Sequence, residues 1–598
     1  MSALLEPESL YSLSDMSVFP TGDGTSLVYL TGSRRAIILE TTLIRALRAI
    51  KYPATGGLLR ERLANNGQGA EVLAFVLREG LVFDEAEPLR AAEPAEAGRT
   101  SPISVIGIPT RNRPNAVQRL LRTLRSTPPC QRPELTTLVL DDSTDPSASS
   151  ALERIVDAER EQHQRVVYIG SPQRRHFIRR LAKESGIDHG LLTFAMDQSS
   201  CPEGTFGAGR NSLLLAAAGQ SILMLDDDFL CGSMVQTPET APGLSLTSAP
   251  DATQFWFFCD DLPAVERKTV CTTELLRVYE ELLGRSVSDL LSTYAASGVD
   301  LSRLARRSRT RLSRRGGTVV GAMLGYCGDP GVANLQYALL PGQSHARLTQ
   351  SESYYCKNLW NRNILRSVCR PTLSDGAFCL AGNLALDANR LLPPFFPVYR
   401  GEDTNFGILI ATCLSGETYM ATLPWSLCHR PVENRELPPA QRILTGDRLA
   451  LHEIVGAFIA ASTAIHFAAE HPTTRLIRLG MHLQDVGRSS DVDFMDELQT
   501  NTVNLMSAKL AYCEDLLKSN QSKPDYWASD VAGYVSSIRE MVKSSSSCVP
   551  VELQDKLIST GPGLSLKESL GKFGELLQAW PTLLNAAARL RVSDGGAF

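Results

Sequence analysis

Short apolar runs alternate with polar turns at the start of the chain and then give way to helical patterns. The segments SVFP, SLVYL and AIILE are β-prone, and the turn sequences TGDG and TGS separate them. Three segments with apolar positions three and four apart follow, namely TTLIRALRAI, GLLRERLAN and EVLAFVLREG. This order predicts a small winged-helix-like α+β domain over residues 14–84.

The next segment, residues 85–102, has the sequence EAEPLRAAEPAEAGRTSP and no apolar periodicity. A composition dominated by Ala, Glu and Pro is typical of an extended, solvated linker. We therefore expect a domain boundary here.

Strand and helix patterns alternate through residues 103–439. The apolar run ISVIGI is typical of a strand buried on both faces, and NAVQRLLRTLRS has helical spacing. TTLVLDD, RVVYIG and SILMLDDD are further strands, and NSLLLAAAG is a helix between the last two. This β-α-β order predicts an α/β fold with a Rossmann-like, mostly parallel sheet flanked by helices. In such sheets ligands bind beyond the carboxyl ends of the strands.

Residues 440–598 show helical spacing and no strand signal. The clearest segments are LHEIVGAFIAASTAIHFAAEH, TNTVNLMSAKLAYCEDLLKS, SDVAGYVSSIREMV and GKFGELLQAWPTLLNAAARL. We expect an all-helical C-terminal domain, which either forms a homodimer or closes over an acceptor. Nothing in these segments selects between the two roles.

Composition narrows the class of protein. The 598 residues are 43% hydrophobic and 21% charged with a net charge of −5, which is ordinary for a globular protein and argues against a nucleic-acid partner. The 13 cysteines include no C-x-x-C pair, so a disulfide scaffold and a thiolate zinc site are disfavoured. The N-terminus has no basic region, and no run of about 18 apolar residues exists. We expect no transmembrane segment and a cytoplasmic location.

Polar side chains gather where the expected strands end and where one helix begins. These segments are residues 109–112, 141–145, 207–211 and 226–228. Because carboxylates crowded at one sheet edge repel each other, a cation is expected among them. A divalent cation with oxygen ligands would take substrate phosphate oxygens as further ligands, and Arg210 could bind the same diphosphate as a fork.

At this point the chain resembles a known family. The ordered motifs IPTRNR, VLDDSTD, GAGRNSLLLAAAG and ILMLDDD resemble the nucleotide-binding half of family-two, GT-A-fold glycosyltransferases. The later segment GNLALDANRLLPPFFPVYRGEDTNFG resembles their acceptor half and contains Gly382-Asn383 and Glu402-Asp403. The resemblance covers residues 103–431 and is interrupted by an insertion at about 232–375.

The resemblance implies a role for each matching residue. Asp403 would be the general base with Glu402 as its neighbour, and Gly382 and Asn383 would lie on the acceptor side. Mn²⁺ or Mg²⁺ would be held by Asp226, Asp228 and His429. The nucleotide sugar would be bound by Pro109, Thr110, Arg111, Asp141, Asp142, Arg210, Asn211, Asp226 and Asp227. Gly209 stands where relatives often have Ala, a change expected to be harmless.

Simpler interpretations stand beside these roles. Asp141-Asp142 and Asp226–Asp228 could be solvated turns, and His429 could be a structural histidine. Asp403 could be a helix N-cap, since GEDTNFG suits one. The basic segment Arg303–Arg315 could be a solvated helix or loop, or it could attract an acidic acceptor, an anionic partner or a membrane surface.

The N-terminal segment has a resemblance of its own. Hairpin strands ending in AIILE, the helix TTLIRALRAI and the closing LAFVLREGLV are similar to PqqD-like domains, which recognise ribosomally made peptides. Such a domain offers a sheet edge to which a leader peptide can add as a strand. The plain alternative is a small domain for packing or oligomerisation.

Together these features imply a soluble, metal-dependent, inverting glycosyltransferase. It would move a sugar from a nucleoside diphosphate donor, a UDP-sugar first of all, to a peptide or protein recruited by residues 14–84. One alternative is transfer to a polysaccharide or lipid-linked glycan. Another is a non-catalytic protein that binds nucleotide sugars or partners on the same scaffold.

Overall fold

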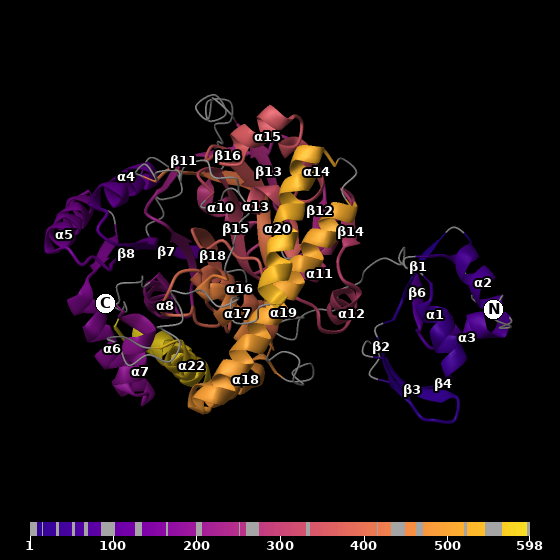
Figure 1. The fold of residues 1–598 in the computed structure, drawn as a ribbon. Coiled ribbons are helices and arrows are strands. Elements are labelled where there is room, and N and C mark those ends of the chain that lie inside the picture. The colour runs from indigo at the N-terminus through magenta and orange to yellow at the C-terminus, as the bar shows by residue number, and fades with distance from the viewer. Residues whose placement is uncertain are drawn as a thin grey trace. The chain divides into compact units, whose positions relative to one another are not determined.

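The protein is described from a computed structural model, which divides into two compact units (Figure 1). One unit contains residues 1–97 and 303–317, and the other contains residues 98–302 and 318–598. The structure describes residues 7, 9–14, 16–30, 35–50, 54–64, 70–84, 102–125, 134–162, 165–198, 206–249, 251–258, 274–330, 335–414, 417–431, 449–461, 471–519, 523–543 and 565–594. The expected linker at 85–102 lies outside the described residues except for Pro102.

The smaller unit is an α+β domain with two antiparallel three-stranded sheets, ordered β2-β3-β4 and β5-β1-β6. Its strands are β1 (Leu10–Leu13), β2 (Met16–Pro20), β3 (Thr25–Leu30), β4 (Arg35–Glu40), β5 (Ala54–Thr55) and β6 (Val82–Asp84). Its helices are α1 (Thr41–Arg48), α2 (Gly56–Ala64), α3 (Ala70–Arg78) and the basic α12 (Arg306–Arg315). The three strands and three helices predicted over residues 14–84 are confirmed.

Alternation along β3 divides this domain into a core side and an outer side. Val28 and Leu30 are buried, whereas Leu27 and Tyr29, which alternate with them, are 37% and 38% exposed. Because successive strand residues point to opposite faces, the apolar residues of the outer face do not contribute to the core. The β2-β3-β4 sheet therefore has an apolar side chain row that faces outward.

The larger unit is built on a mixed sheet that has 13 strands in the described part of the chain. Its main path runs β14-β12-β17-β19-β15-β18-β10-β7-β8-β9, while β11 pairs with β19, and β16 pairs with β13 and β15. The strands are β7 (Ile103–Thr110), β8 (Thr136–Asp141), β9 (Val166–Ile169), β10 (Ser221–Leu225), β11 (Phe229–Gln236), β12 (Leu244–Thr247), β13 (Gln254–Phe257), β14 (Val299–Arg303), β15 (Thr318–Gly328), β16 (Ile364–Ser367), β17 (Thr372–Ser374), β18 (Asn383–Asp387) and β19 (Thr418–His429).

The half of the sheet formed by β10, β7, β8 and β9 is entirely parallel, as the β-α-β pattern predicts. Helices cover this sheet, so the expected α/β fold class is confirmed (Figure 1). The helices between the strands are α4 (Pro114–Arg125), α5 (Pro146–Arg160), α6 (Ser171–Ser185), α7 (His189–Met196), α8 (Phe206–Ala216), α10 (Leu275–Glu280), α11 (Val287–Tyr294), α13 (Leu335–Ala338), α14 (Gly342–Leu348), α15 (Glu352–Asn358) and α16 (Glu402–Cys413).

The segment expected to be an insertion, about 232–375, is part of the same sheet. It supplies β12 to β17, and β15 forms a long parallel pair with β19 and an antiparallel pair with β18. All 11 residues of β15 are buried. This segment therefore completes the sheet core and positions β18 and β19, which carry site residues.

The C-terminal helices are α17 (Leu451–Ala461), α18 (Pro472–Arg488), α19 (Asp491–Ser519), α20 (Asp525–Lys543) and α22 (Leu566–Asp594). The helical character predicted for this region is confirmed. Helix α22 packs along α18 and also contacts α6, α7 and α8. Trp580 in α22 is fully buried and donates its indole N–H to the Leu392 carbonyl at 2.7 Å. These helices thus belong to the unit that contains the sheet.

In the part of the chain that the structure describes, no helix is both long enough and apolar enough to cross a bilayer.

The start of α8 depends on a close approach that only glycine permits. A Cβ at Gly207 would overlap the carbonyl oxygen of Phe396 and lie 2.7 Å from its carbonyl carbon. Because that neighbour is backbone, we expect Gly207→Ala to lower the free energy of unfolding by about 1–3 kcal/mol, measured by thermal unfolding. Gly533→Ala is the matched control, since a Cβ there meets nothing within 4 Å and Ala favours helix α20. Equal stability of the two variants would contradict the expectation.

Candidate functional site

The carboxyl ends of three neighbouring strands meet at one edge of the sheet. Strand β7 lies between β10 and β8, and all three are parallel. They end at Thr110, Asp141 and Leu225, and Leu225 is followed directly by the three aspartates. The topology therefore brings the sequence-predicted segments 109–112, 141–145 and 226–228 to one place, where α/β sheets bind ligands.

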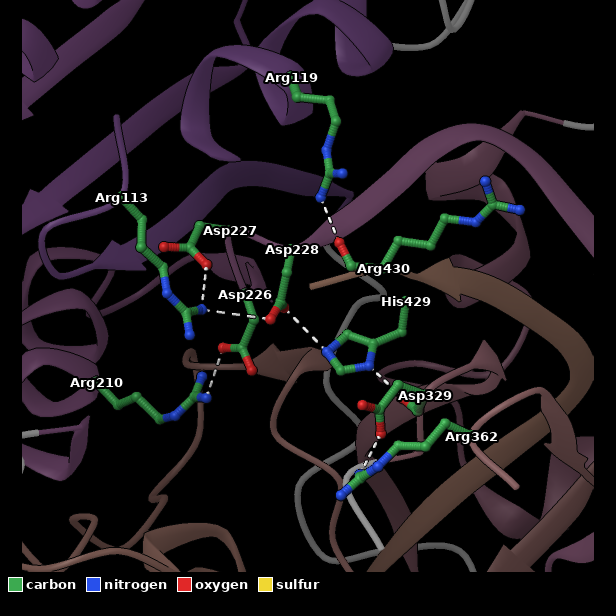
Figure 2. Close-up of polar contacts among 10 residues, drawn as sticks. All are labelled: Arg113, Arg119, Arg210, Asp226, Asp227, Asp228, Asp329, Arg362, His429 and Arg430. Carbon is green, nitrogen blue, oxygen red and sulfur yellow. Dashed lines mark hydrogen bonds and ion pairs between the residues drawn. The ribbon is translucent and has the colours of Figure 1, made fainter. Parts of the chain in front are cut away.

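The three aspartates differ in their surroundings (Figure 2). Asp227 is buried and accepts from Thr110 Oγ1 at 2.6 Å and from Arg113 Nη1 at 3.1 Å. The same Arg113 nitrogen lies 3.3 Å from Asp228 Oδ2. The Asp226 side chain is 36% exposed, the most open of the three. Asp226 is thus the aspartate most accessible to a ligand.

Arg210 joins the end of β10 to the start of α16. Its Nη2 lies 2.8 Å from Asp226 Oδ1, its Nε lies 3.0 Å from Glu402 Oε1, and its Nη1 donates to the Ala381 carbonyl at 2.9 Å. The guanidinium is buried, so its charge-assisted bonds to Glu402 and to the Ala381 carbonyl are shielded from water, whereas the bond to Asp226 is partly open to it. Arg210 therefore holds the acidic strand end and the Glu402-Asp403 pair together.

Strand pairing brings His429 to the aspartates. In the antiparallel pair of β11 and β19, Phe229 lies opposite His429. The histidine Nε2 lies 3.0 Å from Asp228 Oδ1, and its Nδ1 contacts the Asp329 carbonyl oxygen. Burial lowers the pKa of His429, but the hydrogen bond to Asp228, the charges of Asp228 and Asp226 and the Asp329 carbonyl together outweigh it, so the pKa is raised overall.

Asp228 and His429 have the spacing of two ligands of one divalent cation. Because a carbonyl and a carboxylate can only accept, both Nδ1 and Nε2 of His429 donate in this structure, and a cation on Nε2 would take the place of its proton. Two ligands of one ion bound at about 2.1 Å at right angles are about 3 Å apart, which matches the Nε2 to Oδ1 distance of 3.0 Å. Among the described residues no group of three or more His, Cys, Asp or Glu side chains is arranged to hold a metal ion, so Asp228 and His429 supply two ligands of such a site and not a full set.

Charge at the site supports the same conclusion. Burial, together with Asp228 and Asp226, raises the pKa of Asp227 to about 6, against the opposing effects of Thr110 and Arg113. Arg113 is 38% exposed, and its positive charge lies against two of the aspartates. Asp226, Asp227, Asp228 and Glu402 together carry more negative charge than Arg113 and Arg210 offset, an arrangement that suits a cation.

The carboxylates at the end of β8 have partners inside the protein. Asp141 accepts from the Ser143 backbone N–H at 2.8 Å and from the Tyr168 hydroxyl at 2.7 Å. Asp142 forms an ion pair with the fully buried Arg174. A Cβ at Gly209 would lie 3.0 Å from Asp142 Oδ2, so glycine leaves room for this carboxylate.

The loop after β7 is tied to the loop after β8. Asn112 has a left-handed backbone with φ of 57°, and its Oδ1 accepts from the backbone N–H groups of Thr144 and Asp145 at 3.0 and 3.1 Å. Pro109 and Arg111 are half-buried at the same edge. Arg113 reaches the aspartates, a role that the sequence analysis did not assign. The second arginine of PTRNR was the signal for it.

Asn211 and Asn383 use their amide groups on the backbone. Asn211 donates to the carbonyls of Ala195 and Phe395 at 3.1 and 2.9 Å and accepts from Phe395 N–H at 2.8 Å. Asn383 accepts from Leu324 N–H at 2.8 Å. Both side chains are completely buried. Their hydrogen bonds to the backbone hold α8 and β18 in place.

Glu402 and Asp403 are the first two residues of α16, and their side chains have different surroundings. Glu402 is buried against Arg210, and burial raises its pKa although Arg210 lowers it. Asp403 is half-buried, and its Oδ1 accepts from the Thr404 backbone N–H at 2.8 Å. Successive helical residues project in different directions, so Glu402 is committed to Arg210 while the side chain of Asp403 stays partly exposed.

Comparison with known proteins gives distant matches only. No protein-family model matches the chain, and no curated protein matches it. The mannosyltransferase PcManGT from Pyrobaculum calidifontis, solved with GDP-Man and Mn²⁺, is 12% identical over 80% of this chain and 96% of its own, with a TM-score of 0.28. TarS 1-349 from S. aureus, solved with UDP, is 12% identical over 74% and 91%, also with a TM-score of 0.28. At this TM-score the chemistry has to be argued from the chain's own side chains.

Proposed function

We propose that this chain is a metal-dependent, inverting glycosyltransferase of the GT-A type that uses a nucleoside diphosphate sugar. The observation that carries the proposal is the buried Arg210, which links Asp226 at a strand end to Glu402 beside Asp403. A donor-side acid and an acceptor-side acid are thereby fixed within one site. Glycosyl transfer with inversion needs that arrangement, because the leaving group and the general base act on opposite sides of the sugar.

The donor side would hold a diphosphate. Asp226, Asp228 and His429 would hold Mn²⁺ or Mg²⁺, which supplies charge stabilisation to a departing diphosphate. Arg113, with a partly exposed guanidinium at the end of β7, is placed to move from the aspartates to the diphosphate. Thr110 keeps Asp227 in place through the hydrogen bond between their side chains.

The acceptor side would carry the proton transfer. Asp403 takes the proton of the acceptor nucleophile as that atom forms a bond to the anomeric carbon. The bond from the anomeric carbon to the phosphate oxygen breaks, and the nucleoside diphosphate leaves with the electron pair. Glu402 remains paired with Arg210, so its charge stays fixed while that of Asp403 changes.

We further propose that the acceptor is a peptide or protein recruited by the PqqD-like N-terminal domain. Support comes from the outward row on the β2-β3-β4 sheet, where the strand register aligns Phe19, Leu27 and Ile38. Phe19 and Ile38 are 55% and 67% exposed. An exposed sheet with apolar side chains suits an extended peptide that adds to its edge.

The experiment that tests the function is a donor screen with the full chain. UDP-sugars, then other nucleoside diphosphate sugars, are incubated with Mn²⁺ or Mg²⁺ and candidate peptides or glycans, and release of the nucleoside diphosphate is measured. We expect release with at least one donor, a fall of about 100-fold with a chelator, and recovery when Mn²⁺ is restored.

Asp228→Asn serves as the site control in this screen, since it removes one ligand of the proposed metal and should reproduce the chelator's effect. Binding of a nucleotide without turnover by any donor would favour a non-catalytic protein. Turnover that is unchanged by both the chelator and Asp228→Asn would contradict the proposal.

A further inference from the structure

Tyr326 places a hydroxyl beside the most open aspartate of the site. A Cβ at Gly382 would lie 2.5 Å from the Tyr326 hydroxyl oxygen and 3.0 Å from Asp226 Oδ2. Both polar groups are therefore close to one point above Gly382. The glycine permits this approach, because any side chain there would push the tyrosine or the aspartate away.

The ring of Tyr326 is held firmly. It makes an edge-to-face contact with Phe229 at 5.0 Å and lies 5.4 Å from the ring of His429. Its strand, β15, is hydrogen bonded on both sides, and Arg366 lies opposite it in β16. The side chain is therefore fixed by packing and not by its own hydroxyl.

The hydroxyl itself makes no hydrogen bond within the part of the chain that the structure describes, although Tyr326 is only 7% exposed. The hydroxyl oxygen is not one of the fully buried polar atoms that lack a partner, so it is open to a ligand in the site. Burial, followed by the charges of Asp226 and Asp403, raises the pKa of Tyr326, so the hydroxyl stays protonated and neutral.

We infer that the Tyr326 hydroxyl hydrogen-bonds the transferred sugar of the donor and helps to select it. This assignment rests on the proposed function, because it requires that a sugar lie between Asp226 and Asp403. A neutral hydroxyl suits a sugar hydroxyl, since both groups can donate and accept. Sites that bind a substrate hydroxyl in this way reject analogues that place it differently.

The test compares the full-length wild-type chain with Tyr326→Phe, which keeps the ring and removes only the hydroxyl. Calorimetry in the presence of Mn²⁺ measures the Kd for the preferred nucleotide sugar and for its bare nucleoside diphosphate. We expect Tyr326→Phe to raise the Kd for the nucleotide sugar about 10-fold, the effect of one lost hydrogen bond, and to leave the Kd for the bare diphosphate unchanged. For two donors whose sugars are epimers at one hydroxyl, the ratio of their Kd values should also fall in Tyr326→Phe.

Tyr512→Phe is the matched control. Tyr512 lies in α19, is 46% exposed and donates its hydroxyl to the Leu339 carbonyl, so the variant makes the same chemical change away from the site. It should leave both Kd values unchanged. If the wild type transfers sugar and Tyr326→Phe has the same Kd values and epimer preference, the assignment of Tyr326 is overturned and the proposed function stands. If the wild type neither binds nor turns over any donor, both are overturned.

Discussion

Asp403→Asn should reduce turnover about 1,000-fold while the protein still folds and binds the donor. A general base contributes typically about 10²–10⁴-fold, and Asn has the shape of Asp but cannot take a proton at neutral pH. Asn can also accept the hydrogen bond from Thr404 N–H that Asp403 accepts at 2.8 Å, so the start of α16 should not change. The measurement is kcat with the donor found in the screen, together with the Kd for its nucleoside diphosphate.

The matched control for this variant is Asp157→Asn on α5. Asp157 is 58% exposed and forms an ion pair with Arg160 one helical turn away, so the same chemical change there should leave kcat unchanged. A wild-type kcat in Asp403→Asn would show that this aspartate only stabilises the first turn of α16, whose N-cap is Gly401. An increased Kd for the nucleoside diphosphate would instead place Asp403 on the donor side.

Arg210→Met should destabilise the larger unit and abolish turnover. Removing one partner of a buried ion pair costs about 3–5 kcal/mol, because the remaining charge is left without compensation. Here two carboxylates lose their partner, and Glu402 is buried too, with 9% of its side chain exposed against 4% for the arginine. The Tm should fall clearly, and kcat should fall even at temperatures at which the variant is folded, because Asp226 and Glu402 then repel each other.

Two further variants separate stability from the site. Arg475→Met removes another buried arginine, which lies in α18 and pairs with Glu417 at 3.4 Å, so it should lower the Tm and leave the kcat of the folded protein unchanged. Adding Glu402→Gln to Arg210→Met should recover part of the lost stability, since one unpaired charge is removed. An Arg210→Met protein with wild-type Tm and kcat would mean that Arg210 does not join the two sides.

The local sequence pattern correctly predicts the strands of the parallel half of the sheet. Uninterrupted apolar runs such as Ile103–Ile108 and Ser221–Leu225 predict buried strands, and the polar residues after them predict one functional edge, because parallel strands end on the same side. Local pattern could not show that the segment at about 232–375 completes the sheet. Apart from the 11-residue β15 its strands are short, and they pair with segments far along the chain, so their register depends on long-range contacts.

The residues assigned to ligands illustrate the same limit. A motif identifies the residue type but not the direction of its side chain, so Asp142 and Asn211 were assigned to the nucleotide although the structure pairs them with Arg174 and with the backbone around Phe395. Their part in binding stays a prediction. Arg113 and Tyr326 are separated from the aspartates by more than 90 residues, and only the folded chain brings them near.

By itself the sequence determined the α/β class, the helical C-terminal region and the acidic strand ends, since hydrophobic periodicity and strand polarity are local properties. Only the tertiary structure decided which charges meet. The pairing of β11 with β19 puts His429 against Asp228, and Arg210 joins Asp226 to Glu402. The reason is that a buried charge depends on partners supplied by other elements, whose positions are set by packing across the whole sheet.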